Sequence, residues 1–159
     1  MTTFLIETID AQFLQLHKRS VEFVKVINHE KLFWQPRETE NALPVYSCGE
    51  YLLRSAGAVE QTFGGLTVKL WDDPFEWTLP EMLSDGKRIT EYLNEVETTR
   101  KRGFSLLKSD EDLKKEMPAP TKMKTIFALL LETIARAENF QGRAFATFLL
   151  FSDEKLPRL

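Results

Sequence analysis

Apolar side chains recur at three- and four-residue steps through most of this chain, and this period most constrains what the chain can fold into. Residues with that spacing lie on one face of an α-helix, whereas a strand requires alternation. The spacing predicts a helix over about 3–28, with apolar positions at Phe4, Leu5, Ile9, Phe13, Leu16, Phe23, Val24 and Ile27. Similar stripes predict three more helices, over about 47–63, 80–107 and 121–151.

The fold class follows from these four segments. No part of the sequence keeps strand alternation for more than a few residues, so we expect an all-α fold, a four-helix bundle. The segments between the helices are longer than tight turns, which favours long crossover connections. A length of 159 residues fits one domain over 1–159.

Local signals set the expected ends of the helices. Ser47 and Glu50 have the spacing of a capping box, in which the Ser47 hydroxyl accepts from the Glu50 N–H and the Glu50 carboxylate accepts from the Ser47 N–H. Gly64-Gly65 is expected to end that helix. Pro80 suits the first turn of the next helix. The charged stretch 108–120 is expected to be a solvated connection.

Composition excludes several classes of function. The chain has 21 basic and 24 acidic residues, a net charge of −3, whereas nucleic-acid binding favours a basic excess. Its longest apolar run, Ile126–Leu131, is far shorter than the ~20 residues of a membrane-spanning helix. No targeting segment is visible, so we expect a cytoplasmic protein with neither nucleic acid nor membrane as partner. One cysteine and two histidines exclude a metal centre built from several of either.

A few single residues invite functional interpretation. Cys48 falls in the first turn of a predicted helix, but no base is near it in sequence, and we expect a small buried side chain. His17 lies among polar residues and is expected on the surface. Trp71, Phe75 and Trp77 cluster in one connection, where they either cap the end of the bundle or form an exposed patch for a partner.

Three short motifs follow one another along the chain. They are Trp34-Gln35-Pro36 in the first connection, Ser47-Cys48-Gly49-Glu50 at the start of the second helix, and the stretch Arg136–Arg143 late in the last helix. In order and spacing they resemble the DinB/YfiT-like superfamily of bacterial four-helix proteins. The resemblance implies a homodimer and a divalent metal held by three histidines, one on the second helix and two on the last.

This chain departs from the superfamily pattern at all three ligand positions, where it has Arg54, Arg136 and Phe140. A guanidinium stays protonated and offers only donors, and a phenyl ring has no lone pair to give a metal. The resemblance therefore implies a degenerate member that has lost its metal site and uses no cofactor.

The two arginines have two interpretations. Glu50 precedes Arg54 by one helical turn, and Glu132 precedes Arg136 by the same step, which is the favourable order for intrahelical ion pairs. Alternatively, the two guanidiniums replace the charge of the lost ion and hold a carboxylate, phosphate or sulfate.

Two functions follow from these interpretations. The first is a non-catalytic binding or interaction protein, homodimeric and not a metal-dependent enzyme, for which no catalytic residue can be named. The alternative is a transferase related to the metal-dependent S-transferases of the superfamily. It would act on a thiol or a small anion, with Arg54 and Arg136 in place of the metal.

Overall fold

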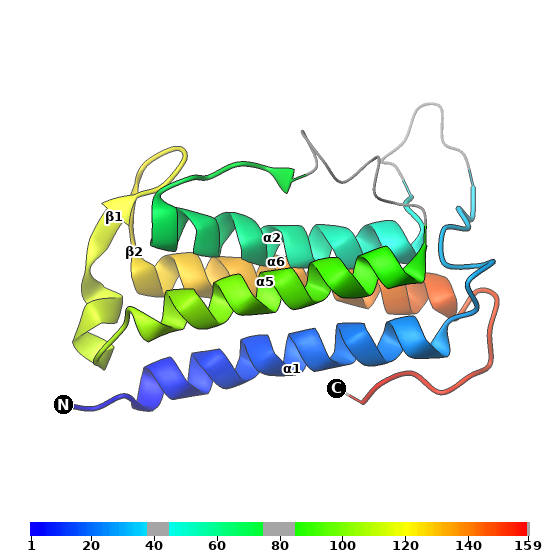
Figure 1. Ribbon diagram of the computed structural model, residues 1–159, viewed down its shortest axis with the longest axis horizontal. Coiled ribbons are helices and arrows are strands. Elements are labelled where there is room, and N and C mark those ends of the chain that lie inside the picture. The colour runs from blue at the N-terminus through cyan, green and yellow to red at the C-terminus, as the bar shows by residue number, and fades with distance from the viewer. Residues whose placement is uncertain (38–44, 75–84, 159) are drawn as a thin grey trace.

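The computed structural model describes residues 1–37, 45–74 and 85–158 (Figure 1). This part of the chain forms four long helices, α1 (Phe4–Val26), α2 (Cys48–Val68), α5 (Gly86–Ser105) and α6 (Ile126–Phe148). The 3-10 helix η1 (Asp110–Lys114) and an antiparallel hairpin, β1 (Glu116–Pro118) with β2 (Met123–Thr125), join α5 to α6. The predicted all-α four-helix bundle is confirmed.

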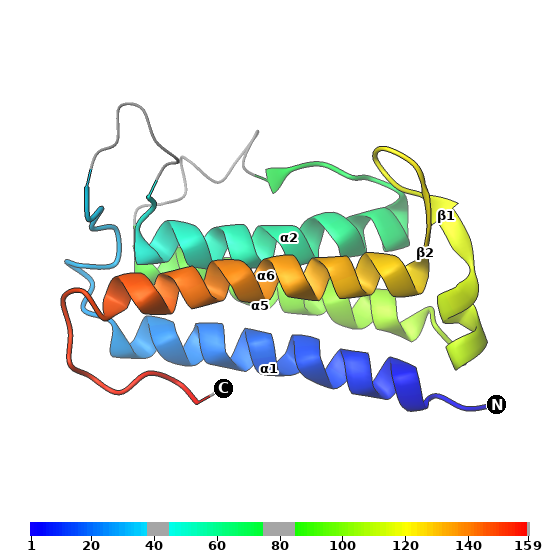
Figure 2. The ribbon, with the colours of Figure 1, turned by 180° about the vertical axis from the view of Figure 1, so that it is seen from behind.

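The helices are arranged so that each packs against two others. α2 packs against α5 and α6, and α1 packs against the same two helices from the opposite side (Figures 1 and 2). α1 and α6 run in one direction, and α2 and α5 run in the other. Because α2 and α5 are parallel neighbours, their connection is a crossover rather than a tight turn. The expected long connections therefore follow from the topology.

Phenylalanines fill much of the core, as the helical stripes predict. Phe63 contacts Phe13 edge-on, with ring centroids 5.3 Å apart, and lies 5.2 Å from Phe104. Such tilted and edge-on pairs are the favoured aromatic geometries. The start of the first stripe is an exception, since Phe4 and Leu5 are exposed. Among the described helices, none is both long enough and apolar enough to cross a bilayer.

Side-chain caps define the starts of three helices. The Ser47 hydroxyl accepts from the Glu50 N–H at 3.2 Å, which confirms the predicted N-cap of α2. The predicted return bond from Glu50 is wrong, because its carboxylate accepts from Arg54 instead. Asp85 caps α5 at the Arg88 N–H, and the predicted start at Pro80 lies outside the described residues.

The last helix begins at Ile126, five residues later than Thr121, where the sequence predicts its start. Residues 123–125 form β2, paired with residues 116–118, and the Thr125 hydroxyl then caps α6 by accepting from the Ala128 N–H at 3.2 Å. The predicted connection 108–120 is therefore partly ordered secondary structure. Each strand has only three residues, too few for a visible alternation.

The prediction that Gly64-Gly65 ends α2 is also wrong. The helix continues to Val68, and Lys69 ends it in the left-handed conformation with φ 57°. Gly65 has a packing role instead, because a Cβ at this position would lie 2.4 Å from the ring of Trp71. The absence of a side chain thus lets the indole of Trp71 lie directly on α2.

Polar side chains in the interior tie the helices together. Gln141 of α6 is 1% exposed, accepts from Arg19 Nε at 2.9 Å, and donates to the Leu16 carbonyl and the Ser20 hydroxyl of α1. Ser55 of α2 donates to the carbonyl of Ala137 on α6 at 2.8 Å. These bonds fix α6 against both of its neighbours, so the side chains on the facing sides of α2 and α6 have defined positions.

Candidate functional site

The three residues at the predicted ligand positions lie together in the structure. Arg54 on α2 and Arg136 and Phe140 on α6 line one hollow of about 150 Å³. Gly57 has no side chain and Ala58 has only a methyl group, which leaves space on the α2 side of the hollow. Further along the hollow, its lining is completed by Gln61 and Asp73. We call this space the first hollow.

Arg54 is held by its own helix and by an aromatic ring. Its guanidinium donates to Glu50 Oε1 from Nη2 at 3.0 Å and from Nε at 3.3 Å. The Tyr46 ring lies under it, with the guanidinium carbon 4.0 Å from the ring centroid. The predicted Glu50–Arg54 pair is confirmed, and cation–π stacking restricts the same side chain further.

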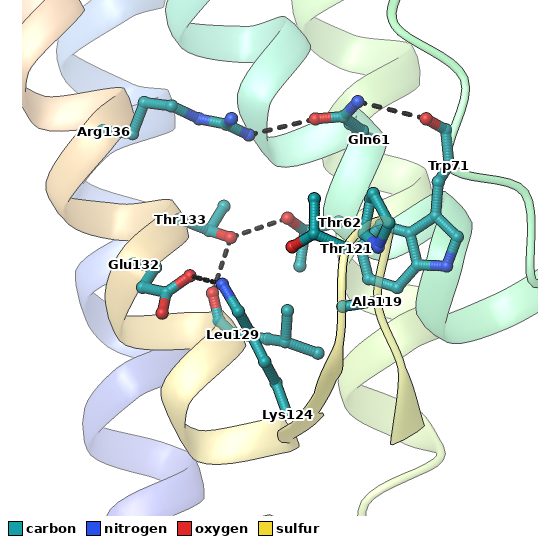
Figure 3. A pocket seen from close by; sticks show the side chains of 11 residues that line it. Gln61, Thr62, Trp71, Ala119, Thr121, Lys124, Leu129, Glu132, Thr133 and Arg136 are labelled. Carbon is teal, nitrogen blue, oxygen red and sulfur yellow. Dashed lines mark hydrogen bonds and ion pairs between the residues drawn. The ribbon is translucent and has the colours of Figure 1, made fainter. Parts of the chain in front are cut away.

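Arg136 does not pair with Glu132, and that part of the prediction is wrong. Lys124 of β2 forms the ion pair with Glu132 instead, because the hairpin brings the Lys124 ammonium group next to the Glu132 carboxylate on α6. Arg136 instead donates from Nη2 to Gln61 Oε1 at 3.2 Å, and Gln61 donates to the Trp71 carbonyl at 3.1 Å (Figure 3). An exposed guanidinium therefore has a neutral amide as its hydrogen-bond partner.

A second hollow of about 240 Å³ adjoins the first and is the one drawn in Figure 3. It lies between the hairpin, α6 and the segment that carries Trp71. Gln61 and Arg136 line both hollows, so their hydrogen bond stands between the two. The remaining lining comes from Thr62, Trp71, Ala119, Pro120, Thr121, Lys124, Leu129, Glu132 and Thr133. Together we call the two hollows the α2–α6 groove.

Among the described residues, the side chains that line the groove include three cations and two carboxylates. The first hollow is lined by Arg54, Arg136 and a single carboxylate, Asp73. The second is lined by Lys124, Arg136 and a single carboxylate, Glu132. Arg54 pairs with Glu50 and Lys124 pairs with Glu132, so Arg136, which is common to both hollows, is the groove cation without an ion pair among the described residues.

The sequence reasoning missed the second hollow. Its walls come from three segments far apart in the chain, and one of them is the unpredicted hairpin. Trp71 is the residue from which the second hollow could have been predicted. A large aromatic side chain a few residues after a Gly-Gly pair can pack on the helix surface where the glycines have no side chain. Of the other aromatic residues predicted to accompany it, Phe75 and Trp77 lie outside the described residues.

Cys48 and the histidines are placed away from the groove lining. Cys48 is fully buried and donates its thiol to the Ala144 carbonyl at 3.3 Å, as predicted for a structural cysteine. Burial raises the pKa of this thiol to about 12, so it stays protonated at neutral pH. Among the residues that the structure describes, no group of three or more His, Cys, Asp or Glu side chains is placed to hold a metal ion.

His17 is not the surface side chain that the sequence predicts. It is half-buried and lies with Glu97 and Arg100 around a small space between α1, α2 and α5. Burial, followed by the positive charge of Lys101, lowers the pKa of His17, which favours the neutral ring at pH 7. The buried pair Glu97–Arg100 of α5 gives the His17 ring polar neighbours inside the bundle, which the local sequence around His17 cannot show.

No protein-family model matches the chain, and no curated protein matches it. The structure itself defines the class of architecture, an all-α four-helix bundle with a charged groove between two antiparallel helices. Membership of the DinB/YfiT-like superfamily stays a prediction.

Proposed function

We propose that this chain is a cytoplasmic, homodimeric and non-catalytic binding protein of the DinB/YfiT-like type, whose α2–α6 groove takes a small anion in place of a metal. One observation carries the proposal. Among the described residues, Arg136 is exposed between the two hollows, its hydrogen-bond partner is the neutral Gln61, and it forms no ion pair, whereas Arg54 and Lys124 each do.

The placement of Arg54, Arg136 and Phe140 supports the part of the proposal that concerns the lost metal. Ligands of a single ion must converge from their helices on one point, and these three residues line one hollow between α2 and α6. Two permanent cations and a phenyl ring have no electron pair to offer at that point. The positions thus suit a former metal site, while the residues that occupy them suit an anion.

Arginine chemistry determines which ligand fits. A guanidinium binds carboxylate, phosphate or sulfate through two parallel N–H donors, and hydrogen bonds to an ionised acceptor are about twice as strong as neutral ones. An anion can therefore displace the Gln61 amide oxygen from Arg136. Arg54, already fixed by Glu50 and Tyr46, offers a positioned positive charge on the other side of the first hollow.

Binding is favoured over the transferase alternative by the side chains at hand. Asp73 is the one carboxylate among the described residues that line the first hollow, and it faces two guanidiniums there. General acid–base catalysis needs a proton acceptor and a proton donor, and no histidine or second carboxylate among the described residues lines this hollow. The Cys48 thiol is the one thiol of the chain, and it is buried, protonated and outside the lining of both hollows.

The proposal is tested with inorganic sulfate as probe, on protein purified without a histidine tag. We expect Arg136→Gln to weaken sulfate binding by about tenfold, since a hydrogen bond to a charged group contributes ~1.5–3 kcal/mol. Arg102→Gln is the matched control, because Arg102 is an exposed arginine on α5 that lines neither hollow. Isothermal titration calorimetry gives both affinities.

Two results would contradict the proposal. Equal loss of sulfate affinity in both arginine variants would mean that the anion responds to the general surface charge. Stoichiometric zinc, nickel or iron in the untagged protein, measured by mass spectrometry, would mean that the metal site is intact.

A further inference from the structure

The second hollow has a different chemical character from the first. Trp71, Leu129 and Pro120 line it with apolar surface, and Lys124 and Arg136 line it as cations. Figure 3 shows Lys124 beside Glu132 and Arg136 further along α6. In ligand sites generally, an apolar wall with a few placed polar groups selects an amphipathic molecule over a bare ion. The lining of this hollow therefore favours a ligand that has both an apolar body and a negative charge.

Two buried hydroxyls, those of Thr62 and Thr133, fix the orientation of such a ligand. Thr133 donates its proton to the Leu129 carbonyl at 2.6 Å, and its oxygen lies 2.6 Å from the Thr62 hydroxyl. Since Thr133 has only one proton, Thr62 is the donor in that pair. Both hydroxyl protons are therefore used within the protein, and this side of the hollow has no O–H left for an anion.

The negative group must consequently lie where the two cations line the hollow. Lys124 reaches this position from β2, with its side chain about one-fifth exposed and paired with Glu132. Arg136 reaches it from α6 while bonded to Gln61. A carboxylate between them would gain two charge-assisted bonds and would leave the rest of the ligand pointing toward Trp71.

The wall formed by Trp71 is already in place. Its ring lies on Gly65, where a Cβ would be only 2.4 Å away, and its carbonyl accepts from Gln61 at 3.1 Å. A side chain that is positioned before binding loses little conformational entropy when a ligand arrives. Offset or edge-on contact with the indole favours an aromatic body over an aliphatic one.

The volume sets the size of the ligand. About 240 Å³ falls below the ~300–1,000 Å³ of sites for drug-sized molecules. A single ring with one carboxylate fits this limit, whereas a nucleotide or a long acyl chain does not.

We propose that the second hollow is a binding site for a small aromatic monocarboxylate. Arg136 and Lys124 bind the carboxylate, and Trp71 packs against the ring. This inference rests on the proposed function in one respect, because Arg136 binds the anion in both proposals. It goes further by naming the chemical class of the ligand.

The test uses benzoate, with benzamide as its neutral counterpart, and follows the indole N–H signal of Trp71 by NMR. We expect benzoate to shift this signal and benzamide to bind at least about tenfold more weakly. Trp71→Leu and Lys124→Gln should each weaken benzoate by about three- to tenfold, and Trp71→Phe should restore most of the affinity because it keeps an aromatic wall. Binding to the Trp71 variants is measured by calorimetry.

Lys122→Gln is the matched control, because Lys122 is exposed on the same hairpin and does not line the hollow. The Lys122→Gln variant should bind benzoate with the same affinity as the parent protein. Thermal unfolding of every variant shows whether the fold is retained, and Trp71→Phe keeps the wall testable if Trp71→Leu unfolds. Equal affinity for benzoate and benzamide would overturn the inference. Benzoate affinity that is unchanged in the variants of both Trp71 and Lys124 would overturn it as well.

Sulfate separates this inference from the proposed function. If sulfate binds in an Arg136-dependent way and benzoate does not bind, the aromatic site is wrong and the anion site stands. If Arg136→Gln changes the affinity for neither sulfate nor benzoate, both are wrong.

Discussion

Asp112 shows how one carboxylate can order a charged connection. Its oxygens accept from the N–H groups of Lys108 and Ser109 at 2.6 and 3.2 Å, and the Lys115 ammonium lies 2.5 Å away. The hydrogen bond from Lys115, followed by those from the two backbone N–H groups, lowers the pKa of Asp112 to about 2. A stretch of sequence that looks like a solvated linker is thereby held in a defined turn.

A pH dependence follows from this lowered pKa. Because the folded pKa lies below the unfolded value of ~3.9, the ionised carboxylate stabilises the fold above about pH 4, and this stabilisation is lost as the pH falls toward 2. We expect Asp112→Asn to lower the melting temperature at pH 7, and the difference from the parent protein to narrow as the pH falls toward 2 and to disappear below it. Glu111→Gln is the matched control, since Glu111 is an exposed neighbour whose ion pair, among the described residues, is with Lys114. Circular dichroism melts across this range would contradict the assignment if both variants behaved alike.

The sequence predicts contacts within a helix better than contacts between segments. Glu50–Arg54 is fixed by the helical repeat, and the structure contains it. Glu132–Arg136 has the same spacing and does not form, because Lys124 arrives from the hairpin and competes for the carboxylate. Helical spacing identifies partners within one helix only. Here the competing partner is Lys124 on β2, and the pairing of β2 with β1 has no signal in the local sequence.

At the scale of the elements, two helical glycines have opposite surroundings. A Cβ at Gly103 of α5 would lie 2.3 Å from the ring of Phe63, which is fully buried in the core. A Cβ at Gly142 of α6 would have nothing within 4 Å. The first glycine permits close packing of two helices, and the second only lowers helix propensity.

These surroundings predict opposite changes in stability. We expect Gly103→Ala to lower the free energy of unfolding by about 1–3 kcal/mol, the usual effect of overpacking a core. Gly142→Ala should raise it by about 0.5–1 kcal/mol, the difference in helix propensity between the two residues. Urea denaturation measures both, and each variant controls for the other because the substitution is the same. Stabilisation by Gly103→Ala would show that α5 does not pack on Phe63 in this way.

The bodies of the helices can be predicted from sequence, while their ends require tertiary information. The 3.6-residue period alone places most of α1, because its buried positions repeat over the whole helix. The end of α2 at Val68 and the start of α6 at Ile126 depend on what packs against them, Trp71 on Gly65 and β2 on β1. The second hollow could not be predicted for the same reason, since those two contacts form its walls.

At the scale of the whole molecule, α6 has both a groove side and an open side. It packs against α2 on one flank and α1 on the other, as Figure 2 shows. Its first half also carries an apolar stripe that the bundle does not cover, with Phe127 and Leu131 at 37% and 45% exposure, and Met123 of the preceding strand β2 is 53% exposed. Contiguous apolar surface of this kind generally marks a contact with another protein.

The proposed homodimer predicts a role for this stripe. Because a two-fold interface brings the same patch of both copies together, Leu131→Glu would place two like charges in the contact and should convert dimer to monomer, with at least a tenfold weaker association. Leu150→Glu is the matched control, since Leu150 is an exposed leucine just beyond the far end of α6. Light scattering coupled to size-exclusion chromatography measures the mass of each variant. A monomeric parent protein at micromolar concentration, or the same mass for both variants, would show that the stripe does not mediate self-association.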